Sequence, residues 1–231
     1  MNDKPEIIVF DMEGTIFKKN FKGPNGHSRG NAWEIFSDNT GEQGTEFREK
    51  MYKKWKNNEI SFIEWCERTA QKYKKEGLKK EFFEETIKKI PYQTGFEKAI
   101  NEIHNNNIKT AIVTGGIKHQ ARRVQSQYNI DYIFATTEFY WDEDNTISDW
   151  NILPFGHHGK ITAINLLAES QGIETEDIGF VCDGHNDIPV AKFINGKTIS
   201  IDGTDKLKSV TDYNLSMDKN TFTDVSKIFL K

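Results

Sequence analysis

The sequence has few cysteines, few prolines and no long apolar run. Among 231 residues there are two cysteines and five prolines, and 31 basic residues nearly balance 35 acidic ones, for a net charge of -4. Cys66 and Cys182 lack the paired spacing of a zinc site or a redox motif, so we expect reduced core thiols in a cytoplasmic protein. No segment has the roughly 18 apolar residues that cross a bilayer. We therefore expect binding neither to membranes nor to nucleic acid.

Apolar residues occur instead in short runs that are typical of buried strands. These runs are residues 7–10, 110–114, 132–136, 178–182 and 198–201. They are too continuous for strands that are buried on one face only. Helical patterns at 117–128 and 161–171 separate some of them. This alternation predicts an α/β fold with a doubly wound, Rossmann-like parallel sheet. Residues 137–151, with Asp144 and Asn145 between two aromatic or β-branched runs, predict a hairpin insertion.

The segment from residue 18 to 93 has a different character. It contains no convincing buried strand, and its apolar residues recur at helical spacing until Pro91. We therefore predict a core domain formed by residues 1–17 and 94–231. A small all-helical cap, formed by residues 18–93, is inserted immediately after the first strand.

The first predicted strand stops on two acids, Asp11 and Glu13. In an open parallel sheet, ligands bind outside the carboxyl ends of the strands, near the point where the strand order reverses. The two side chains would point to a common side if the strand geometry persists. Asp11 could equally cap the turn made by Gly14. This segment alone therefore leaves a structural and a functional role open.

Three further segments place polar groups in comparable positions. "VTGG" ends a strand on Thr114 and opens a helix through two glycines, an arrangement that suits an anion. "VCDGHNDIPV" ends another strand on Asp183 and continues through Asn186 and Asp187. Lys160 stands at the start of a helix between these two segments. Each has an ordinary explanation when taken singly, such as a turn or a helix cap.

Taken together, the segments would gather several carboxylates in one crevice. Close carboxylates repel by a few kcal/mol per pair at an effective dielectric constant of about 20. We therefore expect a divalent cation between them. Magnesium suits a site that has only oxygen ligands, and it can also bind a phosphate oxygen.

In order and context, these segments resemble the four motifs of the haloacid dehalogenase superfamily, specifically its phosphoserine phosphatase-like branch. "DMEGT" resembles the first motif, "VTGG" the second, Lys160 the third and "DGHND" the fourth. Residues 18–93 lie where that branch inserts a helical cap. The resemblance covers nearly the whole chain and implies a phosphatase acting on a small phosphorylated molecule, as a monomer or a homodimer.

The resemblance also implies a role for each residue. Asp11 would be the nucleophile that becomes an aspartyl phosphate, and Glu13 would be the general acid and base. Lys160 would neutralise charge and steady Asp11. The implied phosphate-binding residues are Thr114, Gly115, Gly116, Lys160 and Asn186. The implied Mg²⁺ ligands are Asp11, Glu13 through its backbone carbonyl, Asp183 and Asp187.

The chain departs from that branch at two points. Most relatives carry Asp where this chain has Glu13, and phosphoserine phosphatases usually carry a glutamate shortly after the first motif, where this chain has Asn20. Because that glutamate grips the substrate ammonium, we expect a phosphomonoesterase with a substrate other than phosphoserine. The alternatives are a phosphoserine phosphatase with an altered ammonium site and a phosphate-binding homologue without turnover.

Aromatic residues are frequent in the predicted cap. They include Trp33, Phe36, Tyr52, Trp55 and Trp65. Such stripes at helical spacing more often form a core than a binding site, and we interpret them in that way. Arg48 and Arg68 are interpreted as solvated surface residues, and His157, His158 and His185 as bystanders near the site, because Glu13 fills the acid/base position.

Overall fold

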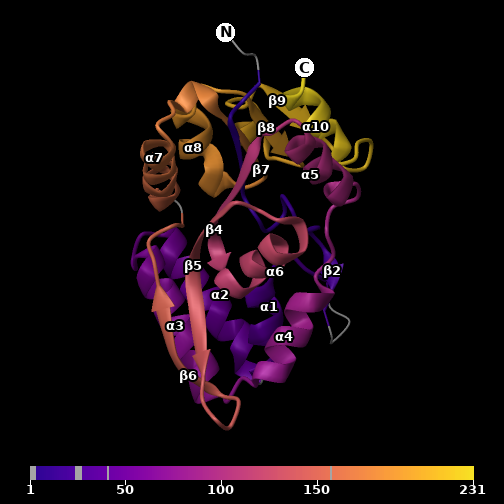
Figure 1. Ribbon diagram of the computed structural model, residues 1–231. Coiled ribbons are helices and arrows are strands. Elements are labelled where there is room, and N and C mark those ends of the chain that lie inside the picture. Colours follow the sequence, from indigo (N-terminus) through magenta and orange to yellow (C-terminus); the bar gives the residue numbers. More distant parts are fainter. Residues whose placement is uncertain (1–3, 24–27, 41, 157) are drawn as a thin grey trace.

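The computed structural model describes residues 4–23, 28–40, 42–156 and 158–231, so that His157 lies outside the described residues. A seven-stranded sheet with the order β6-β5-β4-β1-β7-β8-β9 forms its centre (Figure 1). The strands are β1 (Ile7–Phe10), β4 (Lys109–Ile117), β5 (Tyr132–Trp141), β6 (Ile147–Ile152), β7 (Ile178–Cys182), β8 (Thr198–Ile201) and β9 (Tyr213–Leu215). All neighbours pair in parallel except β5 and β6. The predicted α/β fold is confirmed.

Helices cover both faces of this sheet. One face carries α5 (Phe96–Asn105), α6 (Lys118–Tyr128) and α10 (Thr223–Phe229), and the other carries α7 (Gly159–Gln171) and α8 (Ile188–Phe193); α9 (Asp205–Lys208) is a single turn. In β1, Ile8 and Phe10 pack in the first of these layers, and Ile7 and Val9 in the second. Successive side chains of a strand point to opposite faces of the sheet. A strand with helices packed on both faces therefore has apolar residues at every position.

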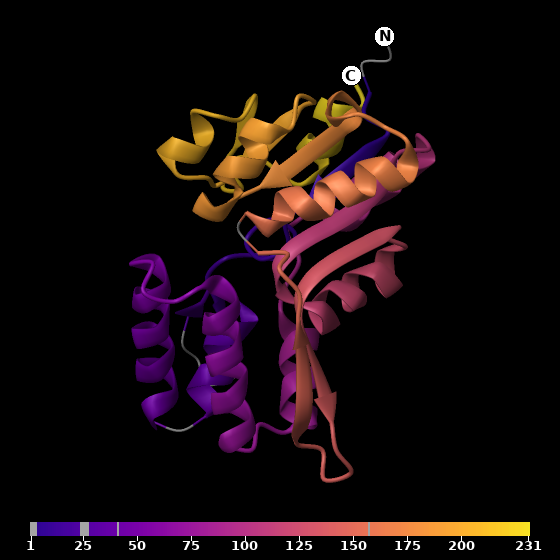
Figure 2. The same cartoon turned by 90° about the vertical axis from the view of Figure 1, so that its left-hand side faces the viewer.

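Among the described residues between β1 and α5 there are four helices and one short ribbon. The helices are α1 (Ala32–Asn39), α2 (Glu42–Lys56), α3 (Phe62–Lys75) and α4 (Lys80–Lys89). Two short strands, β2 (Phe21–Lys22) and β3 (Ser28–Arg29), pair antiparallel before α1, so the segment is not purely helical. Figure 2 shows these helices as a group beyond the end of the sheet. No helix among the described residues has the length and apolar character needed to cross a membrane.

A long hairpin reaches from the sheet to these helices. β5 continues past the sheet and turns back into β6 through Asn145, whose φ of 57° is left-handed (Figure 2). Phe139 is buried against Trp33, with ring centroids 6.1 Å apart, and Trp150 Nε1 donates a hydrogen bond to Glu67 Oε2 at 3.1 Å. The predicted hairpin is confirmed, and it supports one side of the helical group.

Candidate active site

The two principal acids are brought together by neighbouring strands. β1 is the central strand, with β4 on one side and β7 on the other, and Phe10 pairs with Val181. The Asp11 N–H continues this ladder by donating to the Val181 carbonyl at 2.9 Å. Asp11 and Asp183, which follow the two strands, therefore both lie at the carboxyl edge of the sheet, where parallel sheets bind their ligands.

Lys160, in the first turn of α7, is wholly buried between two carboxylates. Its Nζ donates to Asp11 Oδ1 and to Asp187 Oδ1, in both cases at 2.6 Å. Burial by itself lowers the pKa of a lysine, but the charges of Asp11 and Asp187 outweigh it and hold the pKa of Lys160 above its usual value. Lys160 is therefore an ammonium ion that fixes one oxygen of each acid.

Asp11, Asp183 and Asp187 form a compact acidic cluster. Each offers a carboxylate oxygen within 4.8 Å of the others, and all three residues are buried. At an effective dielectric constant of about 20, that separation costs about 3 kcal/mol or more for each pair of charges. Lys19 Nζ lies 2.6 Å from Asp183 Oδ2, and the Thr15 hydroxyl donates to Asp183 Oδ1 at 2.9 Å.

The electrostatics of the cluster favour a cation. Burial raises the pKa of Asp11 to about 6, although Lys160 opposes the shift, and burial also raises the pKa of Asp183 and of Asp187. Buried carboxylates with raised pKa values are stabilised by added positive charge, and three oxygen donors fit a hard divalent metal. The structure thus brings together three of the four residues expected around the metal. The role of the Glu13 backbone carbonyl stays a prediction.

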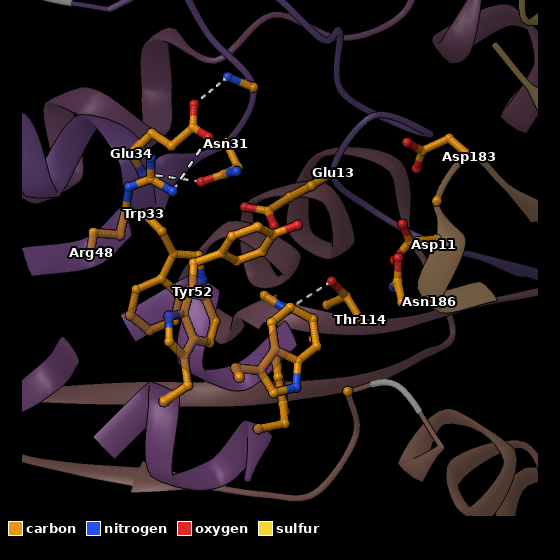
Figure 3. A pocket seen from close by; sticks show the side chains of 18 of the residues that line it. Asp11, Glu13, Asn31, Trp33, Glu34, Arg48, Tyr52, Thr114, Asp183 and Asn186 are labelled. Atoms are coloured by element: carbon orange, nitrogen blue, oxygen red, sulfur yellow. Dashed lines mark hydrogen bonds and ion pairs between the residues drawn. The ribbon is translucent and has the colours of Figure 1, made fainter. Parts of the chain in front are cut away.

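Glu13 lies between the acidic cluster and the helical group. In Figure 3 its side chain is drawn between Asp11 on one side and Trp33 and Tyr52 on the other. Its Oε1 atom is buried and has no hydrogen-bond partner among the described residues. Burial, with a further contribution from the charge of Asp11, raises the pKa of Glu13 to about 8, while the Ala32 backbone N–H acts in the opposite direction. A carboxyl group in this state holds its proton near neutral pH.

The "VTGG" segment differs from the sequence-based expectation. β4 was expected to end on Thr114 and the glycines to open a helix, but β4 continues to Ile117 and α6 begins at Lys118. The cause is its neighbour β5, which keeps pairing with β4 as far as Ile117 after a shift in register. The Gly116 N–H donates to Thr114 Oγ1 at 2.9 Å. A Cβ on Gly116 would lie 2.9 Å from Met12 and 3.3 Å from Glu13, so this close approach favours glycine.

A cavity of about 570 Å³ joins the acidic cluster to helices α1, α2 and α3. Its polar side includes Asp11, Glu13, Thr114, Gly115, Gly116, Asp183 and Asn186. Lys160 and Asp187, which are linked to Asp11 through Lys160 Nζ, are not among the residues that line the cavity. Asn20, where a glutamate was expected from the resemblance, is among the lining residues.

Aromatic side chains form the opposite side of the cavity. We call this set the aromatic wall: Trp33, Tyr52, Trp55, Phe62 and Trp65. Core packing was the sequence-based interpretation, and it is confirmed for Phe36, Trp33 and Trp65, which are buried in the hydrophobic core, although both tryptophans also line the cavity. Trp55 is half-buried against that core, and Tyr52 is exposed. Phe62 was not singled out from the sequence, because helical spacing does not reveal whether an apolar side chain faces a core or a cavity.

Known proteins have related sequences and folds. The family model for haloacid dehalogenase-like hydrolase matches residues 8–192. The phosphoserine phosphatase of Methanocaldococcus jannaschii is 25% identical over 194 residues, which are 83% of this chain and 83% of that protein. Two solved structures share the fold at 23% identity. One, a phospho-aspartyl intermediate analogue of phosphoserine phosphatase, has a TM-score of 0.75 over 97% of this chain and 99% of that one. The other, a substrate-bound phosphoserine phosphatase complex, has a TM-score of 0.72 over 92% and 93%.

The family model spans most of the chain. Asp11, Glu13, Asp183 and the glycine-rich strand end line one cavity, and Lys160 pairs with Asp11 at 2.6 Å. The protein therefore belongs to the haloacid dehalogenase-like hydrolase family, and within it is a phosphoric monoester hydrolase similar to the phosphoserine phosphatases.

Proposed function

We propose that the protein is a Mg²⁺-dependent phosphomonoesterase that hydrolyses a small phosphorylated metabolite through an aspartyl phosphate on Asp11. The observation that carries this proposal is the position of Asp11. It lies at the carboxyl end of the central strand, lines the cavity, and has one oxygen fixed 2.6 Å from Lys160 Nζ. A carboxylate held in this way is oriented for attack on a phosphorus atom in the cavity.

The proposed reaction has two displacements at phosphorus. In the first, an Asp11 oxygen bonds to phosphorus, the bond from phosphorus to the alcohol oxygen breaks, and Glu13 gives its proton to that oxygen. In the second, Glu13 takes a proton from water, which attacks phosphorus and releases Asp11 and inorganic phosphate. The raised pKa of Glu13, about 8 because of burial, supports the role of proton donor. The phospho-aspartyl analogue described for a similar phosphoserine phosphatase fold supports the covalent step.

Residues on the polar side of the cavity would hold the phosphoryl group. We assign this role to the Thr114 hydroxyl, the N–H groups of Gly115 and Gly116, and the Asn186 side chain, all of which line the cavity. Lys160 would keep the Asp11 carboxylate ionised and in place through its ion pair with Asp11 Oδ1 at 2.6 Å.

Mg²⁺ is the metal that we propose for the acidic cluster. Asp11, Asp183 and Asp187 would bind it together with the Glu13 carbonyl, and when bound it would neutralise charge on the phosphoryl oxygens. The donor set supports magnesium, since it consists of carboxylates without thiol or imidazole ligands.

The domain division is also a proposal. Residues 18–93 would act as a cap that closes on the core formed by residues 1–17 and 94–231, and that excludes water during phosphoryl transfer. The support is the cavity itself, because one side is built from the sheet edge and the other from α1, α2 and α3. We further propose a cytoplasmic enzyme, supported by two free, buried cysteines, and leave a monomer and a homodimer as alternatives.

The physiological substrate is proposed to differ from phosphoserine. The curated relative named above is a phosphoserine phosphatase, which favours that substrate. Against it, the cavity presents the amide of Asn20 instead of a carboxylate at the expected ammonium site. A phosphate-binding protein without turnover is the less favoured alternative. The Lys160–Asp11 pair at 2.6 Å and the shared acidic cluster of Asp11 and Asp183 support turnover instead.

Hydrolysis of p-nitrophenyl phosphate tests the enzymatic proposal. The wild-type protein should release p-nitrophenol with Mg²⁺ and not with EDTA, and Asp11→Asn should be inactive under both conditions. Equal, negligible rates for wild type and Asp11→Asn in Mg²⁺ would contradict the proposal.

A further inference from the structure

We propose that the alcohol part of the substrate carries a planar aromatic or heteroaromatic ring with a hydrogen-bond acceptor on it, and that the aromatic wall binds this ring. This inference rests on the proposed phosphatase function, since it concerns the leaving group in the same cavity. Neither the family match nor the relatives assign a role to the wall.

The wall is continuous over most of one side of the cavity. Its members come from three helices. The centroids of successive rings lie 5.4–5.6 Å apart, from Tyr52 through Trp55, Phe62 and Trp65 to Trp33. Trp33 and Trp65 are buried, while Tyr52 keeps 36% of its surface exposed. Figure 3 shows Trp33 and Tyr52 across the cavity from Asp11 and Asn186. An aromatic ring in the cavity therefore has ring faces and edges to pack against.

Phe62 joins the wall to the phosphate-binding side. A Cβ on Gly115 would lie 3.2 Å from the Phe62 ring, and one on Gly156 would clash with that ring. The ring thus packs directly over the backbone beside Thr114. A phosphoester with its phosphorus near Asp11 would have its alcohol part beside Phe62, so the wall is placed to meet the leaving group.

Asn31 and Glu34, two polar residues near the wall, already have partners, which argues against their binding a cationic leaving group. Asn31 Oδ1 caps α1 by accepting from the Glu34 N–H at 3.0 Å. Glu34 Oε2 accepts from the Gly30 N–H at 2.9 Å, and Glu34 Oε1 lies 3.6 Å from Arg48. The Glu34 carboxylate is therefore paired, whereas an ammonium group would need an acid with free charge.

Two buried donors at the cavity remain without partners among the described residues. They are Trp65 Nε1 and Arg48 Nε. Buried N–H groups are nearly always hydrogen-bonded, so unpaired donors on cavity-lining residues indicate that a ligand supplies the acceptor. An oxygen or a carboxylate on the substrate ring would meet this need, and a plain hydrocarbon ring would not.

The cavity is also large for serine as a leaving group. Its volume of about 570 Å³ is within the range of pockets that enclose ligands with rings. A serine moiety would leave much of the wall in contact with water, whereas a ring would cover it. Stacking on aromatic side chains should therefore raise kcat/KM by about 10- to 100-fold relative to a saturated analogue.

A set of phosphoesters tests this inference. Because the three main probes are all esters of primary alcohols, their intrinsic reactivities differ little, and differences in kcat/KM report on binding of the alcohol part. The probes are 4-carboxybenzyl, benzyl and cyclohexylmethyl phosphate, with phosphoserine and phosphocholine for comparison. We expect kcat/KM to fall in the order 4-carboxybenzyl, benzyl, cyclohexylmethyl, and we expect phosphoserine and phosphocholine to lie below benzyl phosphate.

Two variants identify the residues responsible. Trp55→Leu should lower kcat/KM for benzyl phosphate by about 10- to 100-fold and leave cyclohexylmethyl phosphate within about threefold. Trp65→Phe replaces the indole ring, and with it the Nε1–H donor, by a phenyl ring that has no donor. It should therefore abolish the advantage of 4-carboxybenzyl over benzyl phosphate. Circular dichroism and thermal unfolding confirm folding, and the comparison within each variant between two substrates cancels any partial loss of active protein.

The outcomes separate this inference from the proposed function. Mg²⁺-dependent hydrolysis that is lost in Asp11→Asn, with equal kcat/KM for benzyl and cyclohexylmethyl phosphate, would overturn the aromatic subsite alone. Phosphoserine or phosphocholine far above all other probes would also overturn it, in favour of an amino-acid or quaternary ammonium substrate. No hydrolysis of any probe would overturn the proposed function, and the inference with it.

Discussion

Replacing Lys160 by methionine should destabilise the metal-free protein by about 3–5 kcal/mol at pH 8. Lys160 is fully buried and lies 2.6 Å from both Asp11 and Asp187. Methionine fills a similar volume but leaves two buried carboxylates without their cation, in a cluster whose third acid, Asp183, is within 4.8 Å. The expected loss is that of breaking a buried ion pair by removing one partner.

The cost should fall strongly at pH 5. Burial raises the pKa of Asp11 to about 6, and it raises the pKa of Asp187 as well. Without Lys160 these pKa values rise further, so at pH 5 the variant can bind protons on both acids and bury them neutral. The penalty is thus present above the folded-state pKa values and lost below them.

Urea unfolding in EDTA measures this difference. With a slope near 3 kcal/mol per molar urea, the upper part of the usual range, a loss of 3–5 kcal/mol lowers the midpoint by about 1 M or more. Lys98→Met is the matched control, because the Lys98 side chain is 73% exposed and lies 4.0 Å from Glu102, so its midpoint should change little. A midpoint for Lys160→Met equal to wild type at pH 8, or an equal loss at both pH values, would refute the reasoning.

Three other predictions concern the metal, the strand end and pH. Lys19→Ala should lower the Mg²⁺ concentration that gives half-maximal activity, because Lys19 Nζ competes for Asp183 Oδ2 at 2.6 Å; a Mg²⁺ titration that moves to higher concentration would contradict this. Gly116→Ala should lower kcat/KM at least about tenfold, since its Cβ would press on Glu13 from 3.3 Å; steady-state kinetics equal to wild type would exclude that constraint. Metal-free protein should lose thermal stability as pH rises from about 5 to 8, because burial raises the pKa of Asp11 to about 6 and of Glu13 to about 8, so the folded state binds more protons than the unfolded chain. Saturating Mg²⁺ should reduce this loss, and a melting temperature that rises with pH in EDTA would be inconsistent with it.

The sheet was predictable because its central strands are buried on both faces. The IIVF run of β1 and the IGFVC run of β7 are entirely buried. Burial on both faces requires a short, continuous apolar run, a pattern that is typical of strands in a parallel sheet. The convergence of Asp11 and Asp183 followed from strand ends in a parallel sheet. The continuation of β4 past Thr114 did not, because it depends on pairing with the outer part of β5.

The aromatic wall and the unpaired donors could not be predicted for a different physical reason. The sequence pattern of an apolar side chain on a helix is the same whether the side chain packs in a core, as Phe36 does, or lines a cavity, as Trp55 does. The ion pair of Lys19 with Asp183 links residues 164 positions apart, and no local pattern records it. Such features depend on how the helices sit relative to the sheet.

Borohydride trapping of the covalent intermediate tests the central claim most directly. Borohydride reduces an acyl phosphate to an alcohol, so protein that is incubated with Mg²⁺ and a hydrolysable phosphoester and then quenched with borohydride should contain homoserine at position 11. Peptide mass spectrometry should find this change at Asp11 only when the phosphoester is present. Active protein that shows no reduction at Asp11, or that shows it at Asp183 instead, would contradict the account.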